Sequence, residues 1–360
     1  MVNNFWETLP KPFFVLAPLA NVTDAAFRRV IAKYSKPAGP HVFYTEFVSA
    51  DGLCRATEEG KAKLMRDLLF TKEEKPIVAQ FFTATPEHME RAAALARELG
   101  FDGVDINMGC PDRTIEKQGA GAKLTLNPTL AQELIAAAKR GAGDLPVSVK
   151  TRLGYNKDIL EEWLPKLLEA EPAAVIVHAR TRKEMSKVDA HWDRVRRAVE
   201  IRNELGSKTL IVGNGDVKDL EDAQQKARES GADGIMLGRA IFGTPWLFNP
   251  ASELVSQRPS FTDSVQSAPL APSASDQSLT SRTAPSIKDR LHIAIEHTKL
   301  FEELLGDIKN FAIMKKHFKA YVEGFPGAKE LRIELMEATN AKEVEATVEN
   351  FLSKNVTIAE

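Results

Sequence analysis

Residues 101–124 read FDGVDINMGCPDRTIEKQGAGAKL, and this stretch joins a short apolar strand, predicted over 103–107, to a loop that carries a thiol. Cys110 lies in that loop between Gly109 and Pro111. A glycine and a proline leave little side chain to pack and favour an exposed turn. The segment therefore places Cys110 at the carboxyl end of a strand, where α/β folds carry their catalytic and ligand-binding residues. Cys54 has no such flanks, and we interpret it as an ordinary small apolar residue.

Seven further apolar runs surround this segment and alternate with longer helical patterns. They span residues 13–18, 42–47, 76–81, 146–151, 174–178, 209–213 and 234–238. Such alternation is typical of repeated βα units and a parallel sheet. Eight units within roughly 240 residues match a TIM barrel, for which about 250 is usual. The sequence therefore predicts an α/β fold of the (β/α)8 barrel type over residues 1–249.

Polar residues recur at alternate positions of the predicted strands. Successive side chains of a strand point to opposite faces. If the set that contains Ile77, Val104, Val149 and Val175 faces the helices, the polar residues of the opposite set converge inside the barrel mouth. They include Gln80, Asn107, Lys150 and His178.

Two helices show clear boundaries in the sequence. Thr85-Pro86 opens one that ends before Gly100, and Asn127-Pro128 opens another that closes before Gly141. Each returns the chain to the start of the next strand.

Residues 250–286 are rich in Ser, Pro, Thr and Gln, which predicts a flexible linker. Apolar residues then recur at helical spacing over 287–360 and predict a small helical bundle. This region is rich in basic residues: Lys309, Lys315, Lys316, His317, Lys319, Lys329 and Arg332. A charge run of this kind is usually a solvated helix face, and the alternative is contact with a phosphate backbone.

Composition excludes several classes of protein. The 360 residues carry a net charge of -2, so there is no strongly basic signature of nucleic-acid binding, and RNA contact requires a local patch. Two cysteines favour a reducing compartment over a disulfide framework. The amino end resembles neither a signal peptide nor a membrane span, so we expect a cytoplasmic protein without membrane contact. No CxxC or HExxH pattern predicts a metal, and no GxGxxG motif follows the first strand.

Glycine-rich turns follow the last two predicted strands: Gly213-Asn214-Gly215-Asp216 and Gly238-Arg239. Loops at these positions bind phosphate in many TIM barrels, because glycine lets backbone N–H groups approach the anion. The first turn alone is also compatible with an ordinary tight turn. Its combination with Gly238-Arg239 favours a phosphate site.

Several spaced motifs together resemble the tRNA-dihydrouridine synthase family. They are DINMGCP and GAGAKL, with APLANVTDAAFRR, VKTRLG, HARTR, GNGDV and GIMLGRA in the order that family uses. The sequence departs from the family where residues 185–188 read MSKV in place of an aromatic residue and a glycine, and at Asn21, where glycine is usual.

The resemblance implies an enzyme that reduces uridine in tRNA with FMN, which NADPH has reduced. Cys110 is then the general acid, and Asn107 holds the uracil edge. Residues implied in FMN binding are Pro18, Leu19, Ala20, Gln80, Lys150, His178, Asn214, Gly215, Asp216, Gly238 and Arg239. Arg152, Arg180 and Arg182 are expected near the RNA or the flavin phosphate. The helical region 287–360 is expected to bind tRNA, and the protein to act as a monomer.

Two alternatives share parts of this pattern. A dihydroorotate-dehydrogenase-like FMN barrel acts on a free pyrimidine and does not need the basic helical region. A non-catalytic RNA-binding protein built on a flavin barrel does not need Cys110, Asn107 and Lys150 to be intact.

Overall fold

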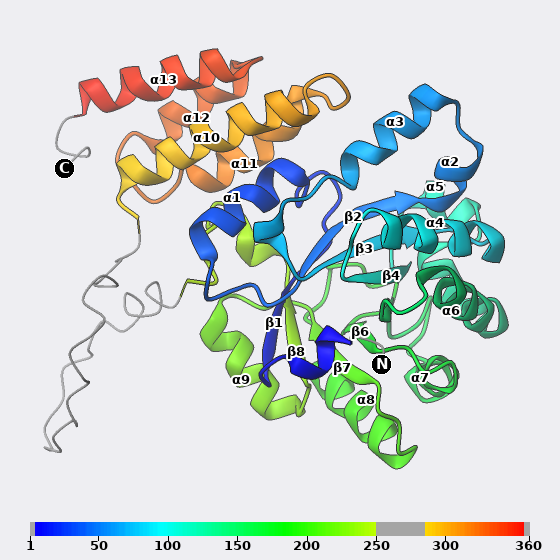
Figure 1. The fold of residues 1–360 in the computed structure, drawn as a ribbon. Helices are drawn as coiled ribbons and strands as arrows, with labels where there is room; N and C mark the ends of the chain where they lie inside the picture. Colours follow the sequence, from blue (N-terminus) through cyan, green and yellow to red (C-terminus); the bar gives the residue numbers. More distant parts are fainter. Residues whose placement is uncertain (1–3, 250–284, 356–360) are drawn as a thin grey trace, which may run out of the picture.

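The computed structural model describes residues 4–249 and 285–355. Except for Pro285 and Ser286, the predicted linker 250–286 lies outside the described residues. Two parts of the chain are thus visible, a barrel and a group of C-terminal helices that lies against one side of it (Figure 1).

Eight parallel strands form the centre of the molecule. They are β1 (Phe13–Leu16), β2 (Phe43–Ser49), β3 (Ile77–Phe82), β4 (Gly103–Met108), β5 (Val147–Arg152), β6 (Ala174–His178), β7 (Leu210–Asn214) and β8 (Gly234–Leu237). The sheet order is β1-β8-β7-β6-β5-β4-β3-β2, and a parallel bridge between Val15 and Val42 joins its two edges. The predicted barrel is therefore confirmed, with strand ends shifted by one or two residues.

Strand alternation places the side chains as predicted. Val104, Val149 and Val175 pack outward in the core shared with the helices. Val78 and Ile176 belong to a separate apolar cluster inside the barrel. This inner cluster fills the barrel below the polar residues, so the mouth is the part left open to a ligand.

The floor of the barrel includes an element that the sequence pattern did not predict. A short 3-10 helix, η1 (Phe5–Thr8), precedes β1 and buries Trp6 completely. The Trp6 ring lies 5.6 Å from that of Phe13, measured between centroids. This segment therefore closes the barrel at the end opposite the site.

Helices surround the strands and connect them. They are α1 (Ala25–Ser35), α2 (Ala50–Arg55), α3 (Glu58–Asp67), α4 (Pro86–Glu98), α5 (Arg113–Lys117), α6 (Pro128–Ala142), α7 (Leu160–Glu169), α8 (Trp192–Glu204) and α9 (Leu220–Ser230). Short 3-10 helices add η2 (Lys72–Glu74), η3 (Gly121–Leu126) and η4 (Arg239–Ile241).

The end predicted for α6 was wrong, because the helix continues through Gly141 to Ala142. A Cβ atom at position 141 would lie 1.9 Å from the Glu90 carbonyl oxygen on α4. Gly141 is thus required where two helix backbones meet closely, whereas Gly143, with a φ of 63°, ends the helix.

The C-terminal region is helical as predicted. It contains α10 (Ile287–Leu305), η6 (Phe311–Ile313), α11 (Met314–Tyr321), α12 (Ala328–Glu337) and α13 (Ala341–Lys354). Helix α10 packs against α1, and its buried side chains Leu291 and Phe301 belong to the same core as those of the barrel. The contact between the two parts is therefore largely apolar.

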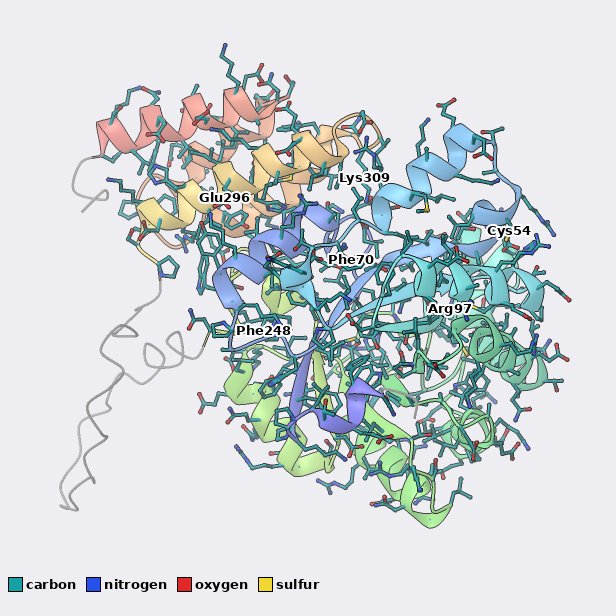
Figure 2. All side chains as sticks on the ribbon, viewed as in Figure 1. Cys54, Phe70, Arg97, Phe248, Glu296 and Lys309 are labelled. Carbon is teal, nitrogen blue, oxygen red and sulfur yellow. The ribbon has the colours of Figure 1, made fainter. Side chains whose placement is uncertain are left out.

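Polar contacts border this apolar contact. Lys33 and Tyr34 of α1 both donate to Glu296 of α10, at 2.7 Å each. Arg66 of α3 pairs with Asp307 at 2.9 Å. Glu296 and Lys309 lie on the face of the C-terminal helices that meets the barrel (Figure 2).

Two residues of the predicted basic face point inward. His317 is fully buried, and the Lys309 side chain is 11% exposed and ion-paired with Glu46 and Asp67. Both belong to the contact with the barrel, so the prediction that they join a solvated or RNA-facing surface was wrong. None of the described helices is both long and apolar enough to cross a membrane.

Candidate active site

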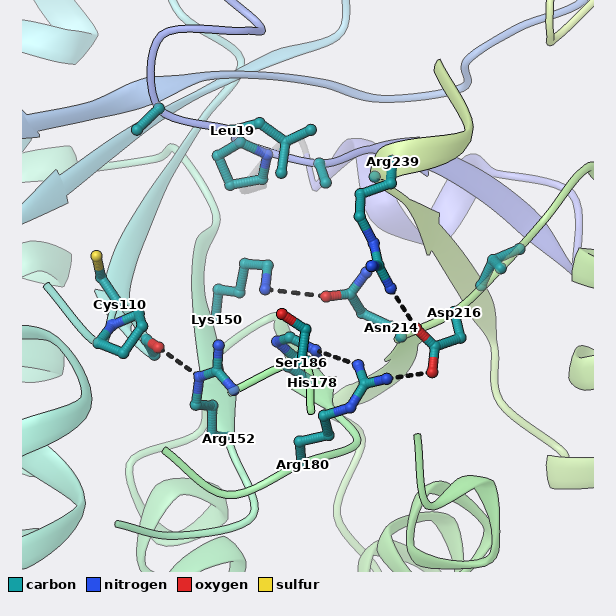
Figure 3. A pocket seen from close by; sticks show the side chains of 18 of the residues that line it. Leu19, Cys110, Lys150, Arg152, His178, Arg180, Ser186, Asn214, Asp216 and Arg239 are labelled. Carbon is teal, nitrogen blue, oxygen red and sulfur yellow. Dashed lines mark hydrogen bonds and ion pairs between the residues drawn. The ribbon is translucent and has the colours of Figure 1, made fainter. Parts of the chain in front are cut away.

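A cavity of about 770 Å³ opens at the carboxyl ends of the strands, within the size range of cofactor and ligand sites (Figure 3). Its wall is built by loops that follow β1, β4, β6, β7 and β8 and by strand residues that point into the mouth. Most of the predicted site residues line it: Pro18, Leu19, Ala20, Gln80, Asn107, Cys110, Lys150, Arg152, His178, Arg180, Asn214, Gly215, Asp216, Gly238 and Arg239.

The Cys110 loop is fixed by its neighbours at the end of β4. The Asn107 Oδ1 atom accepts hydrogen bonds from the backbone N–H groups of Gly109, at 3.1 Å, and Cys110, at 2.9 Å. Arg152 Nε donates to the Gly109 carbonyl at 2.7 Å. Side chains of two adjacent strands therefore hold the loop in one conformation.

Gly121 explains the glycine-rich segment that follows Cys110. Its φ is 62°, and a Cβ there would lie 2.7 Å from the Cys110 carbonyl oxygen. The next residue, Ala122, donates its N–H to that same carbonyl at 2.9 Å. The segment at Gly121 thus packs against the backbone of the Cys110 loop and supports it.

The environment of Cys110 keeps its thiol protonated. Burial raises the pKa of this thiol, and the Asp112 carboxylate acts in the same direction, while the backbone N–H of Asp112 and the positive charges of Arg152 and Lys150 oppose the shift. A raised pKa means that the neutral form predominates at pH 7. Cys110 is therefore suited to give a proton rather than to act as a thiolate nucleophile.

A buried hydrogen-bond chain lies below the site. Asn107 Nδ2 donates to Gln80 Oε1 at 3.2 Å, and Gln80 Nε2 donates to Asp105 Oδ2 at 2.7 Å. Ser148 Oγ donates to the other Asp105 oxygen at 2.6 Å. Burial raises the pKa of Asp105 to about 7, although these two donors favour its charged form. This chain fixes the orientation of the Gln80 and Asn107 amides.

Lys150 contributes a cation to the middle of the cavity. Its Nζ donates to Asn214 Oδ1 at 3.1 Å, and Asn214 Nδ2 donates to the Met236 carbonyl at 2.9 Å. Burial, and then the charge of Arg152, lowers the pKa of Lys150 to about 8. The side chain is thus largely protonated at pH 7 and is held by an amide rather than by a carboxylate.

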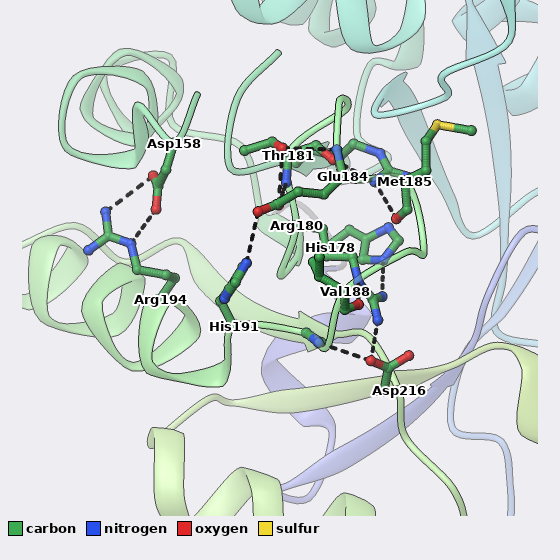
Figure 4. Close-up of polar contacts among 12 residues, drawn as sticks. Asp158, His178, Arg180, Thr181, Glu184, Met185, Val188, His191, Arg194 and Asp216 are labelled. Carbon is green, nitrogen blue, oxygen red and sulfur yellow. Dashed lines mark hydrogen bonds and ion pairs between the residues drawn. The ribbon is translucent and has the colours of Figure 1, made fainter. Parts of the chain in front are cut away.

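A network of charged residues forms the wall between β6 and β8 (Figures 3 and 4). Asp216 accepts from both Arg180 and Arg239 and also from the Ala190 N–H, at 2.9 Å. Arg180 Nη1 lies 3.3 Å from His178 Nε2. Burial and the surrounding cations hold the pKa of His178 well below its usual range. His178 is thus neutral at pH 7, and its Nε2 accepts from the guanidinium.

The three arginines of the predicted substrate set differ in position. Arg182 does not line the cavity, since it forms a bidentate pair with Glu116, with contacts of 2.6 and 2.5 Å. Arg152 and Arg180 line the cavity, but their donors bind backbone carbonyls, His178 or Asp216. Arg239 has a side chain 66% exposed, so it retains access to a ligand.

Other residues of the wall were not among the predicted site residues. Phe47, Met185, Ser186 and Lys218 line the cavity, and Asp105 lies beneath it. Phe47 and Asp105 lie within predicted strands, and Met185 and Ser186 belong to the segment 185–188 that departs from the family motif; these were the available signals. Asp105 lies two residues before Asn107 on β4, so the same strand alternation that turns Asn107 inward turns Asp105 inward as well.

The cavity at the carboxyl ends of the strands is lined by a thiol, a lysine and arginines. A (β/α)8 barrel with such a cavity at this end has the architecture of a barrel enzyme. Within residues 4–249 and 285–355, no group of three or more His, Cys, Asp or Glu side chains is placed to hold a metal ion. The particular family follows from comparison with known proteins.

The family model described as dihydrouridine synthase (Dus) matches residues 15–357. The chain is 37% identical over 353 residues to a probable tRNA-dihydrouridine synthase of Staphylococcus aureus (strain COL), covering 98% of this chain and 96% of that protein. It is 39% identical over 356 residues to the probable tRNA-dihydrouridine synthase 2 of Bacillus subtilis (strain 168), covering 98% of each. The chain therefore belongs to the dihydrouridine synthase family and is an oxidoreductase.

Solved structures of lower identity share the fold. Histamine dehydrogenase from Rhizobium sp. 4-9 matches with a TM-score of 0.50 and 14% identity, over 68% of this chain and 46% of that one. At this identity the likeness supports the barrel architecture alone.

Proposed function

We propose that this chain is an FMN-dependent tRNA-dihydrouridine synthase that uses NADPH and reduces the C5=C6 bond of uridine in tRNA. The observation that carries the proposal is the placement of a neutral thiol, Cys110, on the rim of a cavity that also holds Lys150 and Arg239. The thiol is a proton donor, and the cations match a negatively charged cofactor. Membership of the family supports the same reaction.

The cavity fits FMN in size and in the chemistry of its wall. Arg239 and the turns at Gly215 and Gly238 would hold the phosphate, where small residues and an exposed guanidinium leave room for an anion. Lys150, Gln80 and His178 would contact the ring system, together with the turn of Pro18, Leu19 and Ala20. The Asp216 carboxylate repels phosphate, so its side chain would position Arg180 and Arg239 instead.

When bound and reduced by NADPH, FMN supplies a hydride for C6 of the uracil ring. Cys110 gives its Sγ proton to C5, so that one hydride and one proton are added across the double bond. The resulting thiolate is stabilised by Arg152 and Lys150 until it takes a proton from solvent. Asn107, which Gln80 orients and which fixes the Cys110 loop, would hold the uracil edge.

A uridine within folded tRNA must leave its stack to enter the cavity. The C-terminal helices would contact the RNA body through their exposed cations Lys316, Lys319 and Lys329. Lys309 and His317 do not take part because they are buried against the barrel.

A direct test uses the purified protein without oxygen. We expect a flavin absorption spectrum that NADPH bleaches and that tRNA lacking dihydrouridine restores. Cys110→Ala should keep the spectrum and its reduction by NADPH, while dihydrouridine formation falls about 100-fold or more, as for loss of a general acid. Recovery of the spectrum with a free pyrimidine but not with tRNA would contradict the proposal, and so would a fully active Cys110→Ala variant.

A further inference from the structure

A buried charged cluster connects the C-terminal helices with one wall of the cavity. Lys309 follows α10 and lies at the contact with the barrel (Figure 2). Its Nζ is 2.5 Å from Glu46 Oε2 and 2.8 Å from Asp67 Oδ1. The side chains of Lys309 and Glu46 are 11% and 7% exposed, so water screens this pair little.

Glu46 is bound on its other side to the loop between β1 and α1. Its Oε1 accepts the backbone N–H of Asn21. Asn21 has a φ of 54°, a conformation that costs a residue with a side chain free energy unless its surroundings hold it. The residues just before it, Pro18 to Ala20, line the cavity, as does Phe47, the residue next to Glu46.

Negative charge accumulates around this point. Besides Glu46 and Asp67, Asp24 is buried at the start of α1, where its Oδ1 accepts from the Phe27 N–H at 3.0 Å, while its Oδ2 has no hydrogen-bond partner among the described residues. Burial and the nearby Glu46 raise the pKa of Asp24 to about 7, so this carboxyl gives up part of its charge at neutral pH. Without Lys309, Glu46 would be a buried carboxylate beside Asp67 and Asp24 with no cation paired to it. A buried charge that loses its partner moves toward water or takes up a proton, and either change disturbs the contact with Asn21.

We propose that Lys309 is a positioning residue for the cavity: by pairing with Glu46 it holds the β1–α1 loop, and the C-terminal helices thereby set the shape of the wall formed by Pro18 to Ala20. The inference rests on the proposed FMN function, because that wall is assigned to the flavin. It gives the helical region a second role besides contact with RNA.

The test measures FMN affinity by flavin fluorescence during reconstitution of the full-length apoprotein, without turnover. We expect Lys309→Met to raise the FMN dissociation constant on the order of tenfold, which is within the range of coupling between sites. Lys309→Arg should restore most of the affinity. Lys33→Met is the matched control, because Lys33 pairs with Glu296 across the same contact but at the end of α1 away from the loop.

Glu46→Ala tests the same link from the barrel side and keeps the proposal testable if Lys309→Met does not fold. It removes the acceptor for Asn21, so FMN affinity should fall by a similar factor. In the double variant the two losses of FMN affinity should not add, since both substitutions break the same link from Lys309 through Glu46 to Asn21. Unchanged FMN affinity in Lys309→Met and Glu46→Ala, or equal losses in Lys33→Met and Lys309→Met, would overturn the inference. A wild-type protein that binds no FMN would instead overturn the proposed function.

Discussion

The thiol of Cys110 owes its properties to the residues that fold the loop around it. Asn107 holds the backbone of this loop, and the lack of a side chain at Gly121 lets the following segment approach the Cys110 carbonyl closely. Partial burial in this packing raises the pKa of the thiol. One local arrangement thus gives the residue its position and also its state of protonation.

This protonation state can be measured by alkylation with iodoacetamide in a Cys54→Ser background. Because the thiolate is the reactive form, the rate should rise with pH with a midpoint above the value of about 8.5 for an unperturbed cysteine. The same protein unfolded in denaturant should return to that ordinary value. A midpoint below it in the folded protein would show an activated thiolate and would contradict the proposed role of Cys110 as a general acid.

Residue types and spacing made much of the cavity predictable. Strand alternation placed Gln80, Lys150 and His178 in the mouth, because side chains alternate strictly along a strand. The pairing of Asp216 with Arg180 and Arg239 was not predictable, since it joins loops whose conformations no local pattern encodes. The position of Arg182 outside the cavity was not predictable either, because its partner Glu116 lies on α5, an element distant in the sequence.

Among the elements, α6 shows how packing overrides local sequence signals. Glycine inside a helix usually indicates an end, but Gly141 lies where α4 and α6 touch. The contact with Glu90 is visible only once both helices are placed on the barrel. The eight strands were predictable because each combines apolar residues with a flanking turn, whereas this close approach depends on two distant segments.

Gly141→Ala separates packing from helix propensity. Propensity alone would stabilise the helix by about 1 kcal/mol. A Cβ 1.9 Å from a carbonyl oxygen requires α4 and α6 to move apart, so we expect a net loss of about 1–3 kcal/mol in the free energy of unfolding. Gly60→Ala is the control, because α3 has no buried residues and a Cβ at position 60 would lie 3.0 Å from the Ala56 Cβ rather than 1.9 Å from a backbone oxygen. It should change stability by less than about 1 kcal/mol. Denaturant unfolding measures both, and a stabilised Gly141→Ala variant would contradict the packing argument.

At the scale of the whole molecule, the barrel and the C-terminal helices share one apolar core. The sequence pattern predicted both parts but not their contact, because the amphipathic faces of α10 and α11 do not specify which surface covers them. The contact contains two buried histidines, His297 and His317, whose rings lie 4.5 Å apart and pack on Phe27. Neither His317 nitrogen has a hydrogen-bond partner in the part of the chain that the structure describes.

Because these two histidines are buried with lowered pKa values, we expect acid to destabilise the protein. Burial lowers the pKa of His317 to about 3, and burial together with His317 holds the pKa of His297 well below its usual range. In the unfolded chain a histidine binds a proton below about pH 6.5. Between pH 6.5 and 3 the unfolded state therefore binds more protons, and the free energy of unfolding falls as pH falls, by up to about 1.4 kcal/mol per pH unit for each histidine.

His317→Leu tests this argument through the pH dependence of denaturant unfolding. The variant should lose stability less steeply between pH 6.5 and 4.5, by up to about 1.4 kcal/mol per pH unit, because one proton no longer distinguishes the two states. It should also be as stable as the wild type or more stable at pH 7, since the two buried imidazole nitrogens are gone. An unchanged slope in His317→Leu would mean that His317 takes up its proton in the folded protein, which requires the contact between barrel and helices to open in acid.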